Sequence, residues 1–265
     1  MTVNISCLTF VLSTALVLGH SPFNIVQLLW INLIMDVLAA IAFSTENPHP
    51  TKIRKERIKE NQKIITQLMM RNILSQSLYQ IITMIVLMYA GPAACGISYN
   101  LYHTELTNTD GSASFRMQHQ TFLFHCFVMM NLFNMFNCRV LGSMPVRQPS
   151  IEESSVNEMQ NTGSDGREFN IFTRIFSNWW FLIIVLAELN ITYFMVSYST
   201  LGKLFTTTPI TFGMHLTAVL LGLGSWGICA LTKLTGERLV LAMPLFGEDQ
   251  ATLDNANAIS KSYTS

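Results

Sequence analysis

The feature that most constrains this chain is a series of six long apolar stretches. They are rich in Leu, Ile, Val, Phe and Met, and they run over about residues 1–18, 24–44, 67–90, 119–138, 179–198 and 208–232. A helix needs about 20 mostly apolar residues to cross the hydrocarbon core of a bilayer. None of the stretches alternates with the period of two that a membrane β-strand requires. The sequence therefore predicts an all-α, polytopic transmembrane helix bundle of about six spans.

The composition excludes several other classes of protein. Charged residues make up 12% of the chain, about half of the roughly 25% found in soluble domains. The formal net charge is zero, without a basic face, so we expect no nucleic-acid partner. The five cysteines form neither a CxxC pair nor an even framework, which argues against a zinc knuckle and a disulfide scaffold. The lipid bilayer is the partner that this composition requires.

Basic residues are distributed unevenly between the two sides of the predicted bundle. The side that carries both chain ends holds fourteen Lys and Arg residues, and the opposite side holds only two, Arg116 and Lys203. The fourteen are Lys52, Arg54, Lys55, Arg57, Lys59, Lys63, Arg71, Arg139, Arg147, Arg167, Arg174, Lys233, Arg238 and Lys261. Because basic residues accumulate on the cytoplasmic side of membrane proteins, both termini are predicted to be cytoplasmic.

The spans and loops divide the chain into seven predicted segments. A partial helix over 1–18 precedes a helix over 19–44, a basic cytoplasmic loop over 45–66 and a transmembrane hairpin over 67–140. A cytoplasmic loop over 141–178 contains a Ser-, Asn- and Glu-rich insertion expected to be disordered, and it leads to a second hairpin over 179–232 and a cytoplasmic tail over 233–265. The first helix would be only about 27 Å long. We therefore expect Met1 to lie within a helix that starts upstream, as in a truncated gene model.

Two carboxylates, Asp36 and Glu188, fall within predicted spans. A carboxylate in the middle of a membrane costs at least about 2.5–3.5 kcal/mol, so each is a candidate functional residue. Asn32 precedes Asp36 by four residues, which places both side chains on one face of a helix. Carboxylate and amide oxygens are ligands that a hard cation such as Ca²⁺ prefers. Spacing alone leaves a structural hydrogen bond between helices as an equal alternative.

The residues around Asp36 carry a family resemblance. Residues 26–36 (VQLLWINLIMD), followed by 39–42 (AAIA) and 45–48 (TENP), closely resemble the sixth transmembrane helix of calcium-pumping P-type ATPases, in the form of the plasma-membrane type. Residues 2–4 (TVN) resemble the middle of the fifth helix, and 127–134 (FVMMNLFN) with Asn137 and Arg139 resemble the eighth. Residues 169–178 resemble the entry to the ninth helix. The chain thus resembles helices five to ten, the cation-transporting ATPase C-terminal type.

The resemblance implies a site for a single transported Ca²⁺. The family residues correspond to Asn4 on the fifth helix and to Asn32 and Asp36 on the sixth. Relatives that carry two ions have further oxygen ligands at places that correspond to Cys7, Met35 and Asn131. A thiol and a thioether are poor ligands for a hard cation, and a neutral amide lacks the charge of the acidic residue that those relatives have on the eighth helix, which favours one ion per cycle. Glu188 has no ligand role in the family.

The resemblance also implies what this stretch does not supply. The fourth helix, the phosphorylated Asp of the DKTGT motif and the nucleotide-binding domain do not occur in these residues, so ATP and Mg²⁺ would act only through other domains. We expect the N-terminal part of the pump, with helices one to four and the cytoplasmic domains, as partner, and no catalytic competence in this chain alone. The expected location is the plasma or vacuolar membrane. The tail lacks a basic amphipathic pattern, so C-terminal calmodulin binding is not expected.

Two other functions are alternatives to the membrane domain of a pump. One is a non-enzymatic, pump-derived membrane fragment that binds or inhibits the full-length pump. The other is a six-span channel or carrier, which the absence of a pore loop and of an Arg-rich sensor helix disfavours. An in-frame DKTGT motif upstream of Met1 in the genomic DNA would favour the pump over the independent fragment.

Overall fold

The computed structural model describes residues 1–19, 21–45, 67–94, 113–141, 178–198, 202 and 204–234. Within these ranges every regular element is helical, which confirms the predicted fold class. Five helices are long and apolar enough to cross a membrane: Ile25–Ser44, Met69–Gly91, Met117–Cys138, Trp179–Ser197 and Phe212–Thr232. A sixth, Thr2–Val17, is apolar but shorter. The predicted loops between 46 and 66 and between 142 and 177, and nearly all of the tail, lie outside the described residues.

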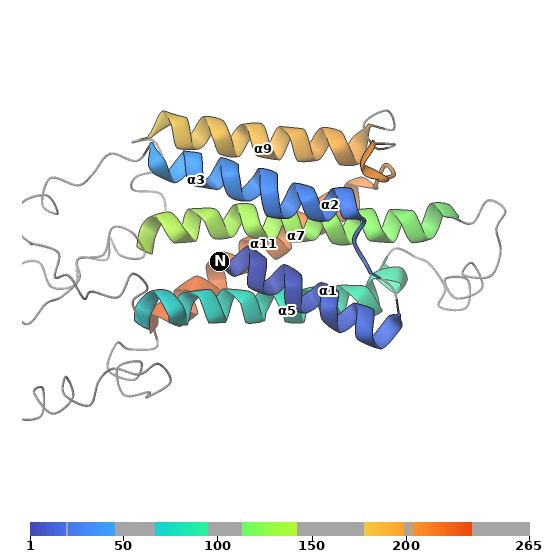
Figure 1. The fold of residues 1–265 in the computed structure, drawn as a ribbon, viewed down its shortest axis with the longest axis horizontal. Helices are drawn as coiled ribbons and strands as arrows, with labels where there is room; N and C mark the ends of the chain where they lie inside the picture. Colours follow the sequence, from blue (N-terminus) through green and yellow to red (C-terminus); the bar gives the residue numbers. More distant parts are fainter. Residues whose placement is uncertain are drawn as a thin grey trace, which may run out of the picture.

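The helices form rods that alternate in direction along the bundle (Figure 1). α1 covers Thr2–Leu18, and the next rod consists of α2 (Ile25–Leu29), the π-helical segment η1 (Trp30–Met35) and α3 (Asp36–Ser44). The remaining rods are α5 (Gln67–Ala94), α7 (Ala113–Leu141), α9 (Trp179–Ser197) and α11 (Phe212–Leu234). The ends of α3, α7 and α11 and the starts of α5 and α9 lie at one end of the bundle. Three predicted segments contain most of the basic residues: the loops over 45–66 and 141–178 and the tail over 233–265. The helices that flank these segments all meet them at that end of the bundle.

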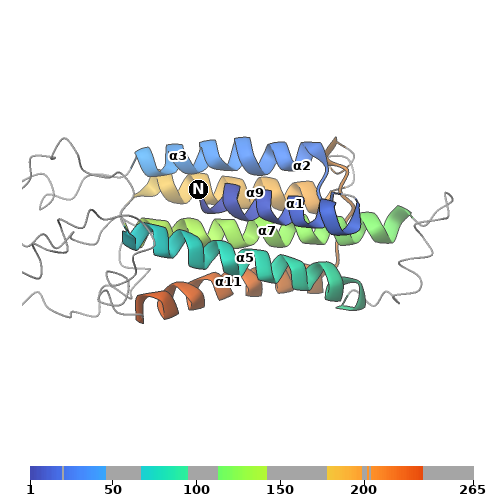
Figure 2. The ribbon, with the colours of Figure 1, turned by 60° about the horizontal axis from the view of Figure 1, so that its bottom comes forward.

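α7 is the central helix of the bundle. Its span is 83% buried, whereas the other four spans are only 28–33% buried. The two ribbon views agree that the other helices surround it (Figures 1 and 2). α11 packs along α7 and α5, α1 packs on α5, and α3 packs on α9. The candidate ion residues therefore lie on the peripheral helices α1, η1 and α3, beside this core.

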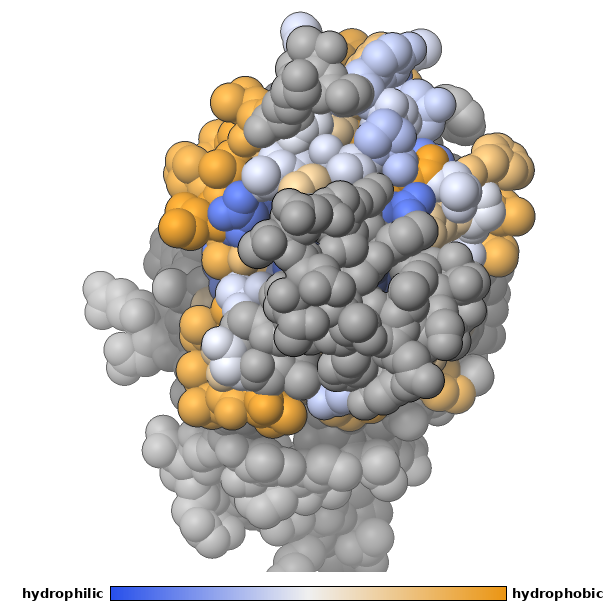
Figure 3. Space-filling model, turned by 90° about the vertical axis from the view of Figure 1, so that its right-hand side faces the viewer, coloured by the Kyte–Doolittle hydropathy of each residue, from blue (hydrophilic) through white to orange (hydrophobic). Residues whose placement is uncertain are grey.

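Large apolar side chains cover the outer faces of the peripheral helices. On α1 the exposed residues recur every three or four positions, as do those of the α2–α3 rod, which matches one face of a helix. They include Leu8, Leu12, Leu16, Ile25, Leu29, Leu33, Val37 and Ile41. Seen end-on, hydrophobic residues lie around the rim of the bundle (Figure 3). Because a membrane protein must be apolar where it meets lipid, this surface fits a bilayer.

Helix caps end α1 and start α2 near the candidate site. Gly19 ends α1 in the left-handed conformation, with φ of 71°, and its N–H donates to Ala15 O at 3.0 Å. Asn24 then caps α2 in a capping box with Gln27, whose Oε1 accepts from the Asn24 N–H at 3.1 Å. This tight connection brings the second rod back alongside α1.

Candidate ion site

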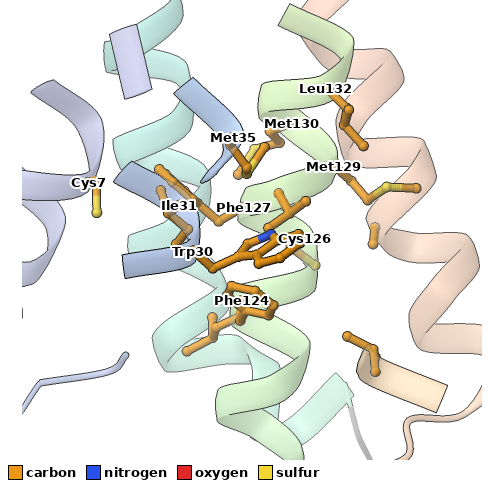
Figure 4. Packing of buried hydrophobic residues seen from close by; sticks show 14 of the residues in the cluster. Cys7, Trp30, Ile31, Met35, Phe124, Cys126, Phe127, Met129, Met130 and Leu132 are labelled. Carbon is orange, nitrogen blue, oxygen red and sulfur yellow. The ribbon is translucent and has the colours of Figure 1, made fainter. Parts of the chain in front are cut away.

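A π-helical segment interrupts the second rod directly before Asp36. η1 spans Trp30–Met35, and the N–H of Asp36 donates to Leu33 O as α3 begins. Such segments occur mostly as local bulges within α-helices, and often at functional sites. Here Trp30, Ile31 and Met35 are buried and point toward α7 (Figure 4), whereas Asn32 is exposed. The bulge therefore turns the polar residue of the motif away from the apolar core.

Asn32 is the point at which the second rod meets α1. Its side chain is a hydrogen-bond partner of the Cys7 thiol, which is 2% exposed. The sequence placed Asn32 and Cys7 on neighbouring family helices but did not predict their contact. The bond holds η1 against α1 at the level of the motif.

Asn4 lies on α1, three residues before Cys7, so the two side chains are one turn apart on a similar face. Asn4 is exposed, and within the described residues no hydrogen bond joins it to Asn32 or Asp36. The structure thus brings Asn32 directly to α1, and it places Asn4 one turn along that helix without a bond to the other two site residues.

Asp36 begins α3 and is partly buried. Across the α3–α9 contact its negative charge acts on Glu188, which is 1% exposed. Neither carboxylate oxygen of Glu188 has a hydrogen-bond partner among the described residues. Asp36 and Glu188 are also the only acidic residues in the described part of the chain. Both acids of the membrane domain are therefore gathered in one region.

The pairing of Asp36 with Glu188 follows from a bond at the end of the two helices. Asn178 Nδ2 donates to Thr45 Oγ1 at 3.2 Å, and the Asn178 side chain also caps α9. The chain enters this tie along α3 and leaves it along α9, so the two helices are antiparallel and lie side by side. Counting nine residues along each leads to Asp36 and Ala187, next to Glu188. The sequence analysis missed this relationship because it had no evidence that α3 and α9 are neighbours.

A chain of buried hydrogen bonds links α1 to α5 and α7. Ser6 Oγ donates to Gln80 Oε1 at 2.6 Å, and Gln80 Nε2 donates to Asn131 Oδ1 at 3.0 Å. Asn131 Nδ2 in turn donates to Phe127 O at 2.8 Å. The amide of Asn131 is thus engaged in bonds between and within helices. Its oxygen already accepts a hydrogen bond, which competes with binding a cation.

The other two places that hold ligands in two-ion relatives are occupied by sulfur. Met35 is 5% exposed and belongs to the apolar cluster that includes Met130 (Figure 4). Cys7 bonds to Asn32. The described residues contain no group of three or more His, Cys, Asp or Glu that could hold a metal ion. A cation at this site would therefore depend on amide and carboxylate oxygens.

The fold defines a polytopic helical membrane protein. The chain belongs to the family described as "Cation transporting ATPase, C-terminus", which matches residues 20–235. The sequence-based resemblance to the C-terminal transmembrane region of a plasma-membrane-type calcium-transporting ATPase is confirmed.

Three relatives illustrate the similarity. Probable calcium-transporting ATPase 9, plasma membrane-type, of Oryza sativa subsp. japonica is 32% identical over 225 residues, which are 85% of this chain and 18% of the relative. Calcium-transporting ATPase 9, plasma membrane-type, of Arabidopsis thaliana is 30% identical over 236 residues, or 88% and 18%. Plasma membrane calcium-transporting ATPase 4 of Homo sapiens is 28% identical over 229 residues, or 86% and 16%. The chain spans less than a fifth of the length of these proteins.

Proposed function

We propose that this chain forms part of the membrane domain of an ATP-driven Ca²⁺ export pump, and that Asn4, Asn32 and Asp36 contribute to a single Ca²⁺ site. The observation that carries the proposal is the π-helical bulge that ends at Asp36 and turns Asn32 toward α1. Asn32 and Asp36 carry amide and carboxylate oxygens at this break in a membrane helix, which supports the proposal. The names of the relatives describe calcium-transporting ATPases, which supports Ca²⁺ as the transported ion.

The assignment of a single ion rests on the contacts of Cys7, Met35 and Asn131, which correspond to the additional ligands of two-ion relatives. The Asn131 oxygen accepts from Gln80, the Met35 thioether packs in the apolar cluster, and the Cys7 thiol bonds to Asn32. Sulfur is a poor ligand for a hard cation, and an amide oxygen held in a hydrogen bond is less available. The proposal therefore assigns the ion to the amide and carboxylate oxygens of Asn4, Asn32 and Asp36.

The chain would supply only part of the ion's coordination. Ca²⁺ takes about six to eight oxygen ligands, more than the three side chains offer. The remaining oxygens, ATP binding and the Mg²⁺-dependent phosphoryl transfer would come from other parts of the pump, including its first four helices. Alone, the chain would not hydrolyse ATP. We place the end of the bundle at which the basic segments connect in the cytoplasm, and the protein in the plasma or vacuolar membrane. Met1 itself lies partway along the bundle, and α1 runs from it away from that end (Figure 1).

A chimaera tests this function. The region of the Arabidopsis relative that aligns with this chain is replaced by the chain, and Ca²⁺ uptake is measured in membrane vesicles. ATP-dependent uptake above that of vesicles without the chimaera is expected. A folded, membrane-inserted chimaera that forms no Ca²⁺-dependent phosphoenzyme would contradict the proposal.

The alternative function is a pump-derived membrane fragment that binds the full-length pump and inhibits it. Co-expression separates it from the proposed one. The chain is therefore co-expressed with the intact Arabidopsis relative. Reduced Ca²⁺ uptake at unchanged pump abundance would support the inhibitor and not the pump domain, whereas unchanged uptake is the result expected here.

A further inference from the structure

Two histidines, His125 and His215, meet at the interface between α7 and α11. His125 Nε2 and His215 Nδ1 lie 3.1 Å apart, and the ring centroids are 4.8 Å apart with an interplanar angle of 81°. His125 is 3% exposed, and His215 is partly buried in the first turn of α11. The ring of Tyr193 on α9 lies 5.3 Å from that of His215. The pair thus joins α7 and α11 beside α9.

Counting protons shows how the neutral pair is arranged. One of the two facing nitrogens must donate and the other must accept. His125 Nδ1, on the far side of its ring, is buried and has no hydrogen-bond partner among the described residues. A buried N–H without an acceptor is rare in proteins. The neutral pair avoids one only if His125 Nε2 donates to His215 Nδ1, which leaves His125 Nδ1 without a proton.

A further proton, which would give the neutral pair a positive charge, cannot be added without cost. If His125 remains the donor, the extra proton can only go to His125 Nδ1, because both His215 nitrogens are already in use. If His215 carries both protons and becomes the donor, His125 must hold its own proton on Nδ1. Each arrangement that keeps the bond creates a buried N–H without an acceptor. The remaining possibility is that the bond breaks and His215 is protonated alone.

The same count argues against a transition-metal ion between the rings. A metal bound to His125 Nε2 would require the proton on Nδ1, where a ligating histidine normally donates to a carboxylate, carbonyl or water. The described residues provide no such acceptor. The pair is suited to holding one proton between its two rings, not to ligation.

No acidic side chain of the described helices compensates a charge on the pair. α5, α7 and α11 contain no Asp or Glu, and Glu188 on α9 interacts with Asp36 instead. The titratable groups nearest along the packed helices are Tyr193 on α9 and Cys126 on α7. On α5, Tyr79 donates to Leu221 O at 2.7 Å, and Arg71 lies at the opposite end of the bundle. An imidazolium here would have no counter-charge.

We propose that His125 and His215 form an acid-opened latch between α7 and α11. The latch is closed at neutral pH, when one proton is shared between the rings. It opens at acid pH, below the range around 6.5 in which free imidazoles are protonated, because the closed pair resists a further proton. Opening frees the first turns of α11 from α7 at the end of the bundle opposite the basic segments. The proposal does not depend on Ca²⁺ transport by the chain.

Hydrogen exchange of the full chain in lipid nanodiscs tests the latch, at pH values of about 7.5 and 5.5, with times corrected for intrinsic exchange. Peptides from the first turns of α11 are compared with peptides from the middle of α5. We expect protection at the start of α11 to fall about fivefold at acid pH relative to α5, which corresponds to the loss of one hydrogen bond.

Three variants show whether the histidine pair causes the loss of protection at acid pH. His215→Gln keeps an amide oxygen that accepts from His125 but does not titrate, so its protection should not change with pH. His125→Gln serves the same purpose if His215→Gln does not fold. His119→Gln is the control, because His119 is equally buried on α7 but contacts Leu87 O at 3.1 Å. It should respond to acid as the unmodified chain does. Constant or greater protection at acid pH, or a fall of equal size in His215→Gln, would overturn the proposal.

Discussion

The charge of Asp36 on α3 reaches the carboxyl group of Glu188 on α9 across a single helix interface, and no other acidic residue occurs in the described part of the chain. Their surroundings differ. Asp36 is partly buried near Asn32, whereas Glu188 is 1% exposed and its oxygens accept no hydrogen bond from a described residue. A buried carboxyl group without donors is less costly as the neutral acid than as the anion. The arrangement therefore favours Asp36 over Glu188 as the carboxylate that binds a cation.

The first prediction concerns Asp36→Asn in the chimaera. The substitution preserves shape but removes the negative charge that offsets dehydration of Ca²⁺. At an effective dielectric constant of about 20, a charge at short range is worth several kcal/mol, which corresponds to at least about a hundredfold in affinity. Ca²⁺-dependent phosphorylation from ATP should therefore be lost, while phosphorylation from inorganic phosphate, which requires the ion-free state, should remain. Both are measured as acid-stable phosphoenzyme.

Glu188→Gln is the matched control for this prediction. It makes the same formal change at the neighbouring carboxyl group, and it should alter the apparent Ca²⁺ affinity little, because no hydrogen bond of a described residue depends on the Glu188 oxygens. Near-normal Ca²⁺ affinity in Asp36→Asn, or loss of transport in a normally folded Glu188→Gln chimaera, would show that the site has been assigned to the wrong residue.

The second prediction concerns the orientation of the chain in the membrane. A cysteine introduced at Ser155 should resist an impermeant thiol reagent in intact cells, whereas one at Thr107 should react. The reason is the excess of basic residues on the side that carries residue 155. Labelling of the unmodified chain gives the background from its five native cysteines. The reverse labelling pattern would invert the topology.

The class of fold was predictable from the sequence, but the meeting points between helices were not. Apolar stretches of about 20 residues determine helices in a membrane whatever their neighbours, because backbone groups must bond within the segment. The effect of the Asp36 charge on Glu188 and the contact of His125 with His215 depend on which helices are adjacent. Each pair is separated by 90 residues or more in the chain. Hydropathy carries no information on such pairing.

The π-helical bulge was likewise not predicted. Residues 30–35 (WINLIM) are strongly apolar, with nothing in their composition that marks a change from i→i+4 to i→i+5 hydrogen bonding. The family resemblance identified Asn32 and Asp36 as site residues but gave no geometry for them. Whether Asn4, Asn32 and Asp36 bind one ion together stays a prediction.

The third prediction concerns the buried bonds that join α1, α5 and α7. Gln80→Leu removes both bonds of a fully buried side chain, so Ser6 and Asn131 lose their partner across the helix interfaces. An unsatisfied buried polar group costs about 1–3 kcal/mol. The thermal unfolding midpoint of the chain in detergent should fall by several degrees.

Asn190→Leu is the comparison for Gln80→Leu. Asn190 is also an amide within a span, but it is exposed and bonds only to Leu186 O on its own helix, at 2.7 Å. Its replacement should leave the midpoint almost unchanged. An equal loss of stability in the two variants would mean that polarity within the span, and not the bonds between helices, determines the effect.

The last prediction concerns the close approach of α11 to α7 at Gly222. A methyl group at Gly222 would overlap the ring of Phe133, whose neighbour Trp226 packs on it with ring centroids 5.2 Å apart. Small residues allow membrane helices to pack closely, and here the ring of Phe133 occupies the space that a Cβ would need. Gly222→Ala should therefore destabilise the bundle by about 1–3 kcal/mol, the usual cost of overpacking. The midpoint of thermal unfolding measures it.

Gly227→Ala separates this packing effect from the preference of the helix for alanine. Gly227 lies five residues further along α11, and a Cβ there would meet nothing within 4 Å. Alanine is favoured over glycine within a helix by about 0.8–1.0 kcal/mol, so Gly227→Ala should be neutral or slightly stabilising. The two substitutions are chemically identical and lie on the same helix, so opposite signs are expected only if Gly222 is in contact with Phe133. A stabilising Gly222→Ala would show that α11 does not pack against α7 as closely as described.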